Sequence, residues 1–93
     1  MDKLLFVMLL EKRRPFDAAV IARHIAYLRQ LDDNGQLVLC DPFTDYPGGM
    51  VAIRADNRDS AEAICQSDPF VAEGYETYSI RTLEVATKEN GYG

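Results

Sequence analysis

The first apolar run of the chain, Leu4 to Leu10, places the strongest constraint on the fold. Successive side chains of an extended strand point to opposite faces, so KLLFVMLL is apolar on both of them. This pattern is typical of a central strand that is covered on each side, rather than of an exposed edge. The run is too short to cross a membrane as a helix, which takes about 20 apolar residues.

The next segment has the pattern of an amphipathic helix. Charged residues and Pro15 end the strand, Asp17 is suited to the N-cap position, and Asn34 with Gly35 supplies the end of the helix. At about 100° per residue one arc of this helix is apolar, with Tyr27 at its rim, and consists of Val20, Ile21, Ile25, Leu28 and Leu31. His24 is the single histidine of the chain and lies in the middle of that arc, so we predict that its ring faces inward.

The remaining elements complete a βαββαβ order. QLVLCDPF, closed by Pro42, and MVAIRA predict two strands that the turn TDYPGG joins into a hairpin. DNRDSAEAICQS predicts a short helix capped by Asp59 or Ser60. DPFVAEG predicts a turn with room for one helical turn, and YETYSIRTLEV predicts the last strand. We therefore predict an α+β fold, the ferredoxin-like plait, with a four-stranded antiparallel sheet and two helices on one face. We expect a single domain over residues 1–93 that ends in a polar, frayed tail at 87–93.

The apolar first strand also bears on the oligomeric state. In a ferredoxin-like plait the helices cover one face of the sheet and leave the other bare, yet this strand is apolar on both faces. An exposed apolar patch of several hundred Å² is unusual on a soluble monomer. We expect a homodimer in which the bare faces of two sheets pack together.

Composition and charge exclude several classes of function. The net charge is −5, the sequence pI is about 4.7, and no basic cluster is longer than Lys12 to Arg14, so nucleic acid is not an expected partner. The chain starts with MDK and shows no signal-peptide pattern, from which we expect a cytoplasmic protein without a membrane association. Cys40 and Cys65 fit no CxxC spacing, so we expect free, buried thiols rather than a disulfide.

An imidazole that faces inward needs a hydrogen-bonding partner or a ligand, because burial without one is costly. The topology brings several polar residues to the end of the sheet near His24, namely Arg13, Arg14, Asp41, Asp45, Tyr46 and Asp68. A carboxylate bonded to one ring nitrogen would make the other a general acid or base. Asp68 is the first choice for that partner, although the sequence does not separate it from Asp41. A histidine that is simply packed and satisfied in the core is the plainer alternative.

Other chemistry finds little support in the sequence. One histidine with scattered aspartates is not a ligand set for zinc, so we expect no metal. A glycine-rich phosphate loop and a nucleophile motif are both missing, which argues against nucleotide cofactors and against serine or cysteine hydrolase chemistry. An arginine at Arg13 or Arg14 could hold a substrate carboxylate through a bidentate pair.

The chain resembles the YciI-like (YCII) family over nearly its whole length. The resemblance rests on RHIAYL, NGQLVLCDP, GGMVAI and SAEAICQSDPF, and above all on His24 together with the late Asp68–Pro69–Phe70. It implies a ferredoxin-like protomer, a homodimer of the dimeric α+β barrel type, and a pocket with a His–Asp pair for acid/base chemistry. Relatives with a demonstrated reaction look like dehydrochlorinases of chlorinated ring-cleavage products, and the wider fold includes muconolactone isomerases. The family more usually has Gly-Pro where this chain has Asp41–Pro42.

Two functions follow as hypotheses. In the first, His24 oriented by Asp68 moves a proton on a small carboxylated metabolite, as an isomerase or a lyase of the dehydrochlorinase type. Arg13 or Arg14 then binds the substrate anion, Tyr46 or Tyr27 contributes a hydroxyl, and Asp41 adds a carboxylate to the pocket floor. In the second, the protein is a ligand-binding or accessory dimeric module without catalysis.

Overall fold

The computed structural model describes residues 4–93, apart from the side chain of Asp41. Its seven elements follow the order β1, α1, β2, β3, α2, α3, β4. Their bounds are Leu4–Lys12 for β1, Ala18–Asp33 for α1, Leu37–Pro42 for β2, Gly48–Ile53 for β3, Arg58–Gln66 for α2, Pro69–Ala72 for α3 and Glu76–Glu84 for β4. The order is that of the ferredoxin-like plait, with one added helical turn, α3.

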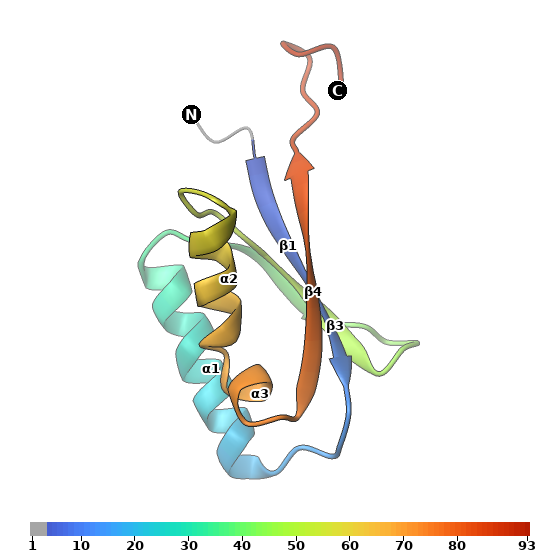
Figure 1. Ribbon diagram of the computed structural model, residues 1–93. Helices are drawn as coiled ribbons and strands as arrows, with labels where there is room; N and C mark the ends of the chain where they lie inside the picture. Colours follow the sequence, from blue (N-terminus) through green and yellow to red (C-terminus); the bar gives the residue numbers. More distant parts are fainter. Residues whose placement is uncertain (1–3) are drawn as a thin grey trace.

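The four strands form one antiparallel sheet in the order β2-β3-β1-β4. As predicted, β1 is central: it pairs with β3 on one side and with β4 on the other. Figure 1 shows α1 and α2 lying together over one face of this sheet. The C-terminal end of β1 and the N-terminal ends of α1 and β4 lie at the same end of the molecule, and α3 lies there too. The fold is therefore the α+β plait expected from the sequence.

The core lies between the helices and the sheet. On the helix side of β1 the side chains of Phe6, Met8 and Leu10 are buried, whereas the alternate residues Leu5, Val7 and Leu9 are only half-buried. Burial within the chain therefore follows one face of the strand, although the strand is apolar on both. The second apolar face of β1 is the one that the rest of the chain does not cover.

Helix α1 begins and ends where the sequence predicts. Asp17 caps its N-terminus and accepts a hydrogen bond from the Val20 amide at 2.8 Å, and Asn34 follows its last residue. The predicted apolar arc is only partly buried: Val20 and Leu31 are buried, but Ile21 and Ile25 are 40% and 43% exposed. The helix wheel does not distinguish a core from a pocket wall, and both isoleucines line an open pocket.

The predicted N-cap of α2 is wrong by two or three residues. Asn57, not Asp59 or Ser60, is the cap, and its side chain accepts the amide of Ser60 at 2.8 Å. Asn57 has an extended backbone and precedes the helix, while Asp59 lies inside the first turn. The helix ends at Gln66, and Asp68 then caps the short helix α3 that fills the predicted turn.

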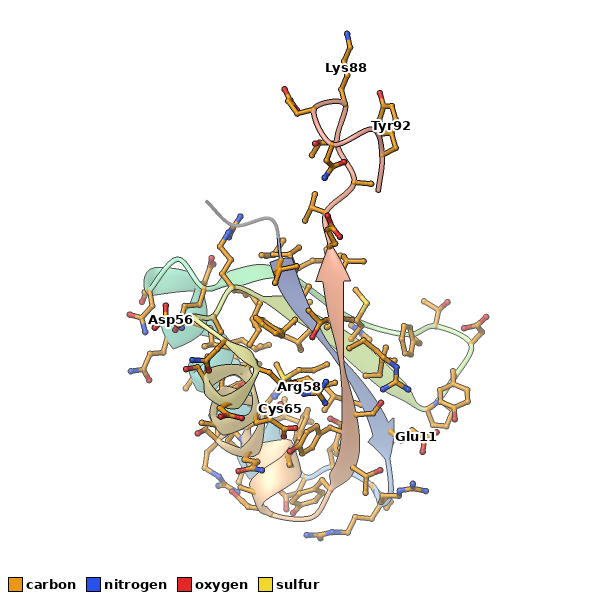
Figure 2. All side chains as sticks on the ribbon, turned by 45° about the horizontal axis from the view of Figure 1, so that its top comes forward. Glu11, Asp56, Arg58, Cys65, Lys88 and Tyr92 are labelled. Atoms are coloured by element: carbon orange, nitrogen blue, oxygen red, sulfur yellow. The ribbon has the colours of Figure 1, made fainter. Side chains whose placement is uncertain are left out.

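Two further features lie outside the core. The tail after β4 extends away from the body of the domain, where Figure 2 shows Lys88 and Tyr92, and it is closed by local hydrogen bonds such as that from the Tyr92 amide to the Thr87 carbonyl. Within residues 4–93, no helix is long and apolar enough to span a membrane. Cys65 is a buried free thiol, and burial raises its pKa to about 12.

Candidate functional site

A pocket of about 610 Å³ lies between α1 and the helix-side face of the sheet, next to the β2–β3 hairpin. Most of its wall is apolar or aromatic. The lining residues are Leu10, Lys12, Phe16, Ile21, His24, Ile25, Leu28, Cys40, Pro42, Phe43, Tyr46, Pro47, Gly48, Gly49, Met50, Val51, Phe70 and Glu76. A small, mostly pre-formed cavity of this kind, with a few polar groups in an apolar wall, is typical of a small-molecule site.

The hairpin reaches the wall of the pocket because of a close backbone contact at Gly48. A Cβ atom at this position would lie 2.0 Å from the carbonyl oxygen of Leu10, which no side chain tolerates. The amide of Lys12 also donates to the Pro47 carbonyl at 3.0 Å. These contacts hold the loop between β2 and β3 against the end of β1.

His24 and Asp68 are brought together across 44 positions of sequence. The Nδ1 atom of His24 lies 2.8 Å from Oδ1 of Asp68. The histidine side chain is 15% exposed and the aspartate only 1%. Asp68 is held by the start of α3, where its Oδ1 also accepts the Phe70 amide at 2.9 Å as the N-cap of that helix. The carboxylate is therefore held by a backbone amide as well as by its contact with the histidine.

The ring of His24 is also held from the side by aromatic stacking. Its centroid lies 3.9 Å from that of Phe70 with 14° between the planes, and Phe70 stacks in turn on Phe16 at 4.1 Å. Phe16 precedes α1, Phe70 belongs to α3, and His24 is two turns into α1. Rings from three segments thus fix the plane in which the imidazole lies.

This geometry distinguishes the two nitrogens of His24. An ionised carboxylate only accepts hydrogen bonds, so Asp68 selects the tautomer with hydrogen on Nδ1. The lone pair then resides on Nε2, and the ring lines the pocket. An imidazole held in this way can take a proton from a bound molecule and return it.

The sequence reasoning missed Glu76, the first residue of β4. Its side chain lines the pocket, the residue is only 6% exposed, and Oε1 has no hydrogen-bond partner among the described residues. Burial raises its pKa to about 7, with a smaller contribution from the charge of Asp68 and opposite contributions from His24 and Lys12. A signal was present, because in YETYSIRTLEV the alternation puts Glu76 on the same face as Tyr78 and Ile80.

Lys12 was also missed as a pocket residue, because KRR reads as a solvated loop. In the structure β1 continues to Lys12, which lines the pocket with its Nζ 4.5 Å from the ring centroid of Phe16. Arg13 and Arg14 do not line the pocket. Arg13 contacts Glu11 and Thr77, and Arg14 donates to the Glu73 carbonyl and lies over the ring of Tyr75.

The two predicted tyrosines differ in position. Tyr46 lines the pocket and its hydroxyl donates to the carboxylate of Glu11, which raises the pKa of the phenol. Tyr27 is absent from the wall, because its hydroxyl donates to the Ile64 carbonyl at 2.8 Å and so connects α1 to α2. Asp41 belongs to β2, but its side chain lies outside the part of the chain that the structure describes.

The described side chains do not form a group of metal ligands. Across residues 4–93, with the Asp41 side chain set aside, no three His, Cys, Asp or Glu side chains are grouped as metal ligands. Among the described residues, the polar groups in or beside the pocket include the imidazole of His24 with its carboxylate, the carboxyl of Glu76, the ammonium of Lys12, the phenol of Tyr46 and the thiol of Cys40. Their chemistry is that of proton transfer and hydrogen bonding.

Structural comparison finds the same fold in two enzymes. 5-Chloro-2-hydroxyhydroquinone dehydrochlorinase (TftG) from Burkholderia phenoliruptrix AC1100, in complex with 2,5-dihydroxybenzoquinone, superposes with a TM-score of 0.67 at 19% identity over 91% of this chain and 97% of its own. Muconolactone isomerase superposes with a TM-score of 0.71 at 12% identity over 85% of this chain and 86% of its own. Identity this low supports a shared fold and no more.

Sequence comparison identifies the family. The uncharacterized protein YjpA of Bacillus subtilis (strain 168) is 32% identical over 76 residues, which cover 82% of this chain and 89% of that protein. The model of the YCII-related domain matches residues 5–84, from β1 to the end of β4. The matched range contains both His24 and Asp68. The chain therefore belongs to the YCII-related family.

Proposed function

We propose that this protein is a small enzyme that moves a proton on a small carboxylated metabolite, as an isomerase or a lyase. One observation carries the proposal: His24 has one nitrogen held by a buried carboxylate and presents its ring to an apolar pocket. A base in such a pocket acts in a medium of low dielectric constant, where its interactions with a substrate are stronger than in water.

The two fold neighbours support the reaction class. Their names describe a dehydrochlorinase and an isomerase. Loss of hydrogen chloride from a hydroquinone requires protons to be taken from hydroxyl groups and delivered to the ring as chloride leaves, and isomerisation of a lactone moves a proton between carbons, so both reactions need a base and an acid at fixed positions. His24 with Asp68 supplies such a group here, with Tyr46 as a candidate hydroxyl in the pocket wall.

The proposal includes a homodimer, located in the cytoplasm, that forms through the uncovered face of the sheet. That face carries apolar side chains from all four strands, including Leu5, Val7, Leu9, Leu39, Met50 and Leu83. Leu39 and Leu83 are 50% and 47% exposed in the protomer. A second sheet would remove this area from water at roughly 25 cal/mol per Å².

The test is proton exchange at carbon. We would incubate the protein in D2O with a panel of small ring and open-chain carboxylates, including muconolactone, and follow the loss of carbon-bound proton signals by NMR. Chloride release from 5-chloro-2-hydroxyhydroquinone would be measured in parallel. The expected result is exchange or turnover of at least one compound, lost in His24→Gln and retained in the control Asp32→Asn, which alters an exposed position of α1.

Three outcomes separate the hypotheses. Exchange that survives in a folded His24→Gln variant would contradict the role of His24. Binding of panel compounds without exchange or turnover would favour the ligand-binding module. A His24→Gln variant that fails to fold, while Asp32→Asn folds normally, would assign the histidine to the core instead.

A further inference from the structure

Two polar side chains of the pocket, Lys12 and Glu76, are direct neighbours across the sheet. In the pairing of β1 with β4, Lys12 lies opposite Glu76. Residues directly opposite each other in an antiparallel pair project to the same face. Both side chains line the pocket, so this face is the one under the helices. The wall therefore contains an ammonium and a carboxyl side by side at the end of the sheet near α3.

Neither side chain has a hydrogen bond or an ion pair with another described residue, although Lys12 is exposed to solvent and Glu76 is buried. Oε1 of Glu76 is buried without a hydrogen-bond partner. The structure places no described carboxylate within ion-pair distance of the Lys12 ammonium, which contacts the ring of Phe16 instead. The two side chains do not form a salt bridge with each other either. A buried polar atom without a partner carries a free-energy cost that a bound ligand could remove.

The raised pKa of Glu76 makes its carboxyl group able to donate a hydrogen bond near neutral pH. Burial is the largest cause of its raised pKa of about 7, the negative charge of Asp68 raises it further, and electrostatic interactions with His24 and Lys12 lower it. Near neutral pH a large fraction of this carboxyl group is protonated. A protonated carboxyl donates one hydrogen bond, whereas a carboxylate only accepts.

We propose that Lys12 and Glu76 form the subsite that binds the carboxylate of the pocket's ligand, Lys12 as the cation and protonated Glu76 as a hydrogen-bond donor. The inference rests on the proposed function for the existence of a small-molecule ligand in this pocket. It transfers the role of anion binding from Arg13 and Arg14, which lie outside the pocket wall, to these two residues. A ligand carboxylate would give each of them the partner that the described chain lacks.

The rest of the wall indicates the body of that ligand. Beyond the Lys12–Glu76 subsite, the side chains of Phe16, Ile25 and Phe43 present apolar and aromatic surface. Such surface favours a flat, weakly polar body rather than a sugar or a phosphorylated compound. The ligand class is therefore a small planar carboxylic acid, with its acid group at the subsite and its ring or double bonds toward His24.

A carboxylate bound in this way requires the proton on Glu76, because two adjacent carboxylates repel each other. Binding is thus linked to protonation. Affinity should be constant below the pKa of Glu76 and fall about tenfold per pH unit above it. At a pH one unit above that pKa, the complex should take up about 0.9 proton per molecule of ligand.

The test uses benzoate as the probe and the full-length protein. Calorimetric titration in two buffers of different ionisation enthalpy measures affinity and proton uptake from pH 6 to 9, and carbon-13 NMR follows the side-chain carboxyl of Glu76. We expect proton uptake at pH 8 in the wild type and none in Glu76→Gln, whose amide donates at every pH. Lys12→Gln should weaken benzoate about tenfold, the worth of one charge-assisted contact.

Matched controls address general effects of charge. Glu84→Gln alters an exposed residue of the same strand, and Lys88→Gln an exposed residue of the tail far from the pocket (Figure 2). Both should bind benzoate like the wild type, with the same pH dependence. Benzamide, which has the same shape without the charge, should bind with no dependence on Lys12.

Several results would overturn the subsite. One is titration of Glu76 together with the exposed glutamates, which would mean an ionised side chain. Others are benzoate binding that Lys12→Gln leaves unchanged, proton uptake at pH 8 that persists in Glu76→Gln, or no effect of benzoate on the Glu76 signal up to its solubility. None of these results bears on His24, whose role is tested by the proton-exchange experiment. The subsite can therefore be wrong while the proposed function holds, and the reverse.

Discussion

The imidazole of His24 lies flat against the ring of Phe70, with 3.9 Å between the centroids. The amide of the same Phe70 donates to Oδ1 of Asp68, the oxygen that also contacts Nδ1 of His24. One tripeptide, Asp68–Pro69–Phe70, therefore holds the histidine by its edge and by its face. Pro69 at the first position of α3 directs the chain into this turn, because its fixed φ favours the start of a helix.

Replacing Phe70 should loosen the histidine as well as the core. Phe70→Ala should lower the free energy of unfolding by about 3–5 kcal/mol, as for other buried phenylalanines. Phe70→Leu keeps an apolar side chain but loses the ring stacking, which contributes about 0.5–1.5 kcal/mol of its own. Urea unfolding measures both. In Phe70→Leu the ring-proton signals of His24 should also move downfield, since the shielding by the stacked ring is gone; unchanged signals would contradict the stacking.

Removal of the Asp68 side chain should cost more than removal of a helix cap. Asp68→Ala loses a cap, worth about 0.5–2 kcal/mol, and leaves the His24 N–H without its partner, at about 1–3 kcal/mol more. Asn57→Ala is the matched control, because it removes the cap of α2 without touching a histidine. Chemical denaturation compares the two variants, and nitrogen-15 NMR reports whether Nδ1 still carries the hydrogen of the neutral ring. An equal loss in both would argue against the His24–Asp68 bond.

The buried carboxyl of Glu76 should make the protein less stable at alkaline pH. Its folded pKa of about 7 lies above the ordinary value of 4.5, so between these values the folded state binds a proton that the unfolded state does not. The contribution of Glu76 is therefore most favourable below about pH 4.5 and is lost as the pH rises through 7, by up to about 3 kcal/mol. Glu76→Gln should remove this slope, so that its Tm exceeds that of the wild type at pH 8.5.

The control for that experiment is Glu84→Gln, in the same strand but exposed. It should follow the wild-type Tm at every pH. If Glu76→Gln and the wild type showed parallel profiles, the carboxyl would be ionised and paired in the folded state. That result would also argue against its role as a donor to a ligand.

A charge in the uncovered face of the sheet should separate the expected dimer. Leu9 lies at the centre of this face, between Met50 of β3 and Ser79 of β4. Leu9→Glu would have to bury a carboxylate in a sheet-to-sheet contact, so sedimentation equilibrium should show a monomer. Ala26→Glu, on the exposed side of α1, should leave the dimer intact. A wild-type monomer at micromolar concentration would exclude the proposed packing.

Much of the architecture follows from local patterns in the sequence. The alternation and length of the apolar runs predict the four strands, and Asp17 with Asn34 predicts the bounds of α1. The cap of α2 was misplaced because Asn57, Asp59 and Ser60 are all residues that favour this position, and only the backbone conformation distinguishes them. The helical period likewise places His24 on the inner arc.

The sequence alone indicated that His24 and the late Asp-Pro-Phe turn lie at the same end of a ferredoxin-like sheet, because helix periodicity and βαββαβ topology are set by local propensity and chain order, and only the tertiary structure showed the contact between His24 and Asp68. Only the tertiary structure decided which groups the pocket contains. The register of β1 against β4 puts Lys12 beside Glu76, and the same strand ends leave Arg13 and Arg14 outside the wall. Such neighbours depend on pairing between distant strands and on the space left between helix and sheet, which no local pattern of residues encodes.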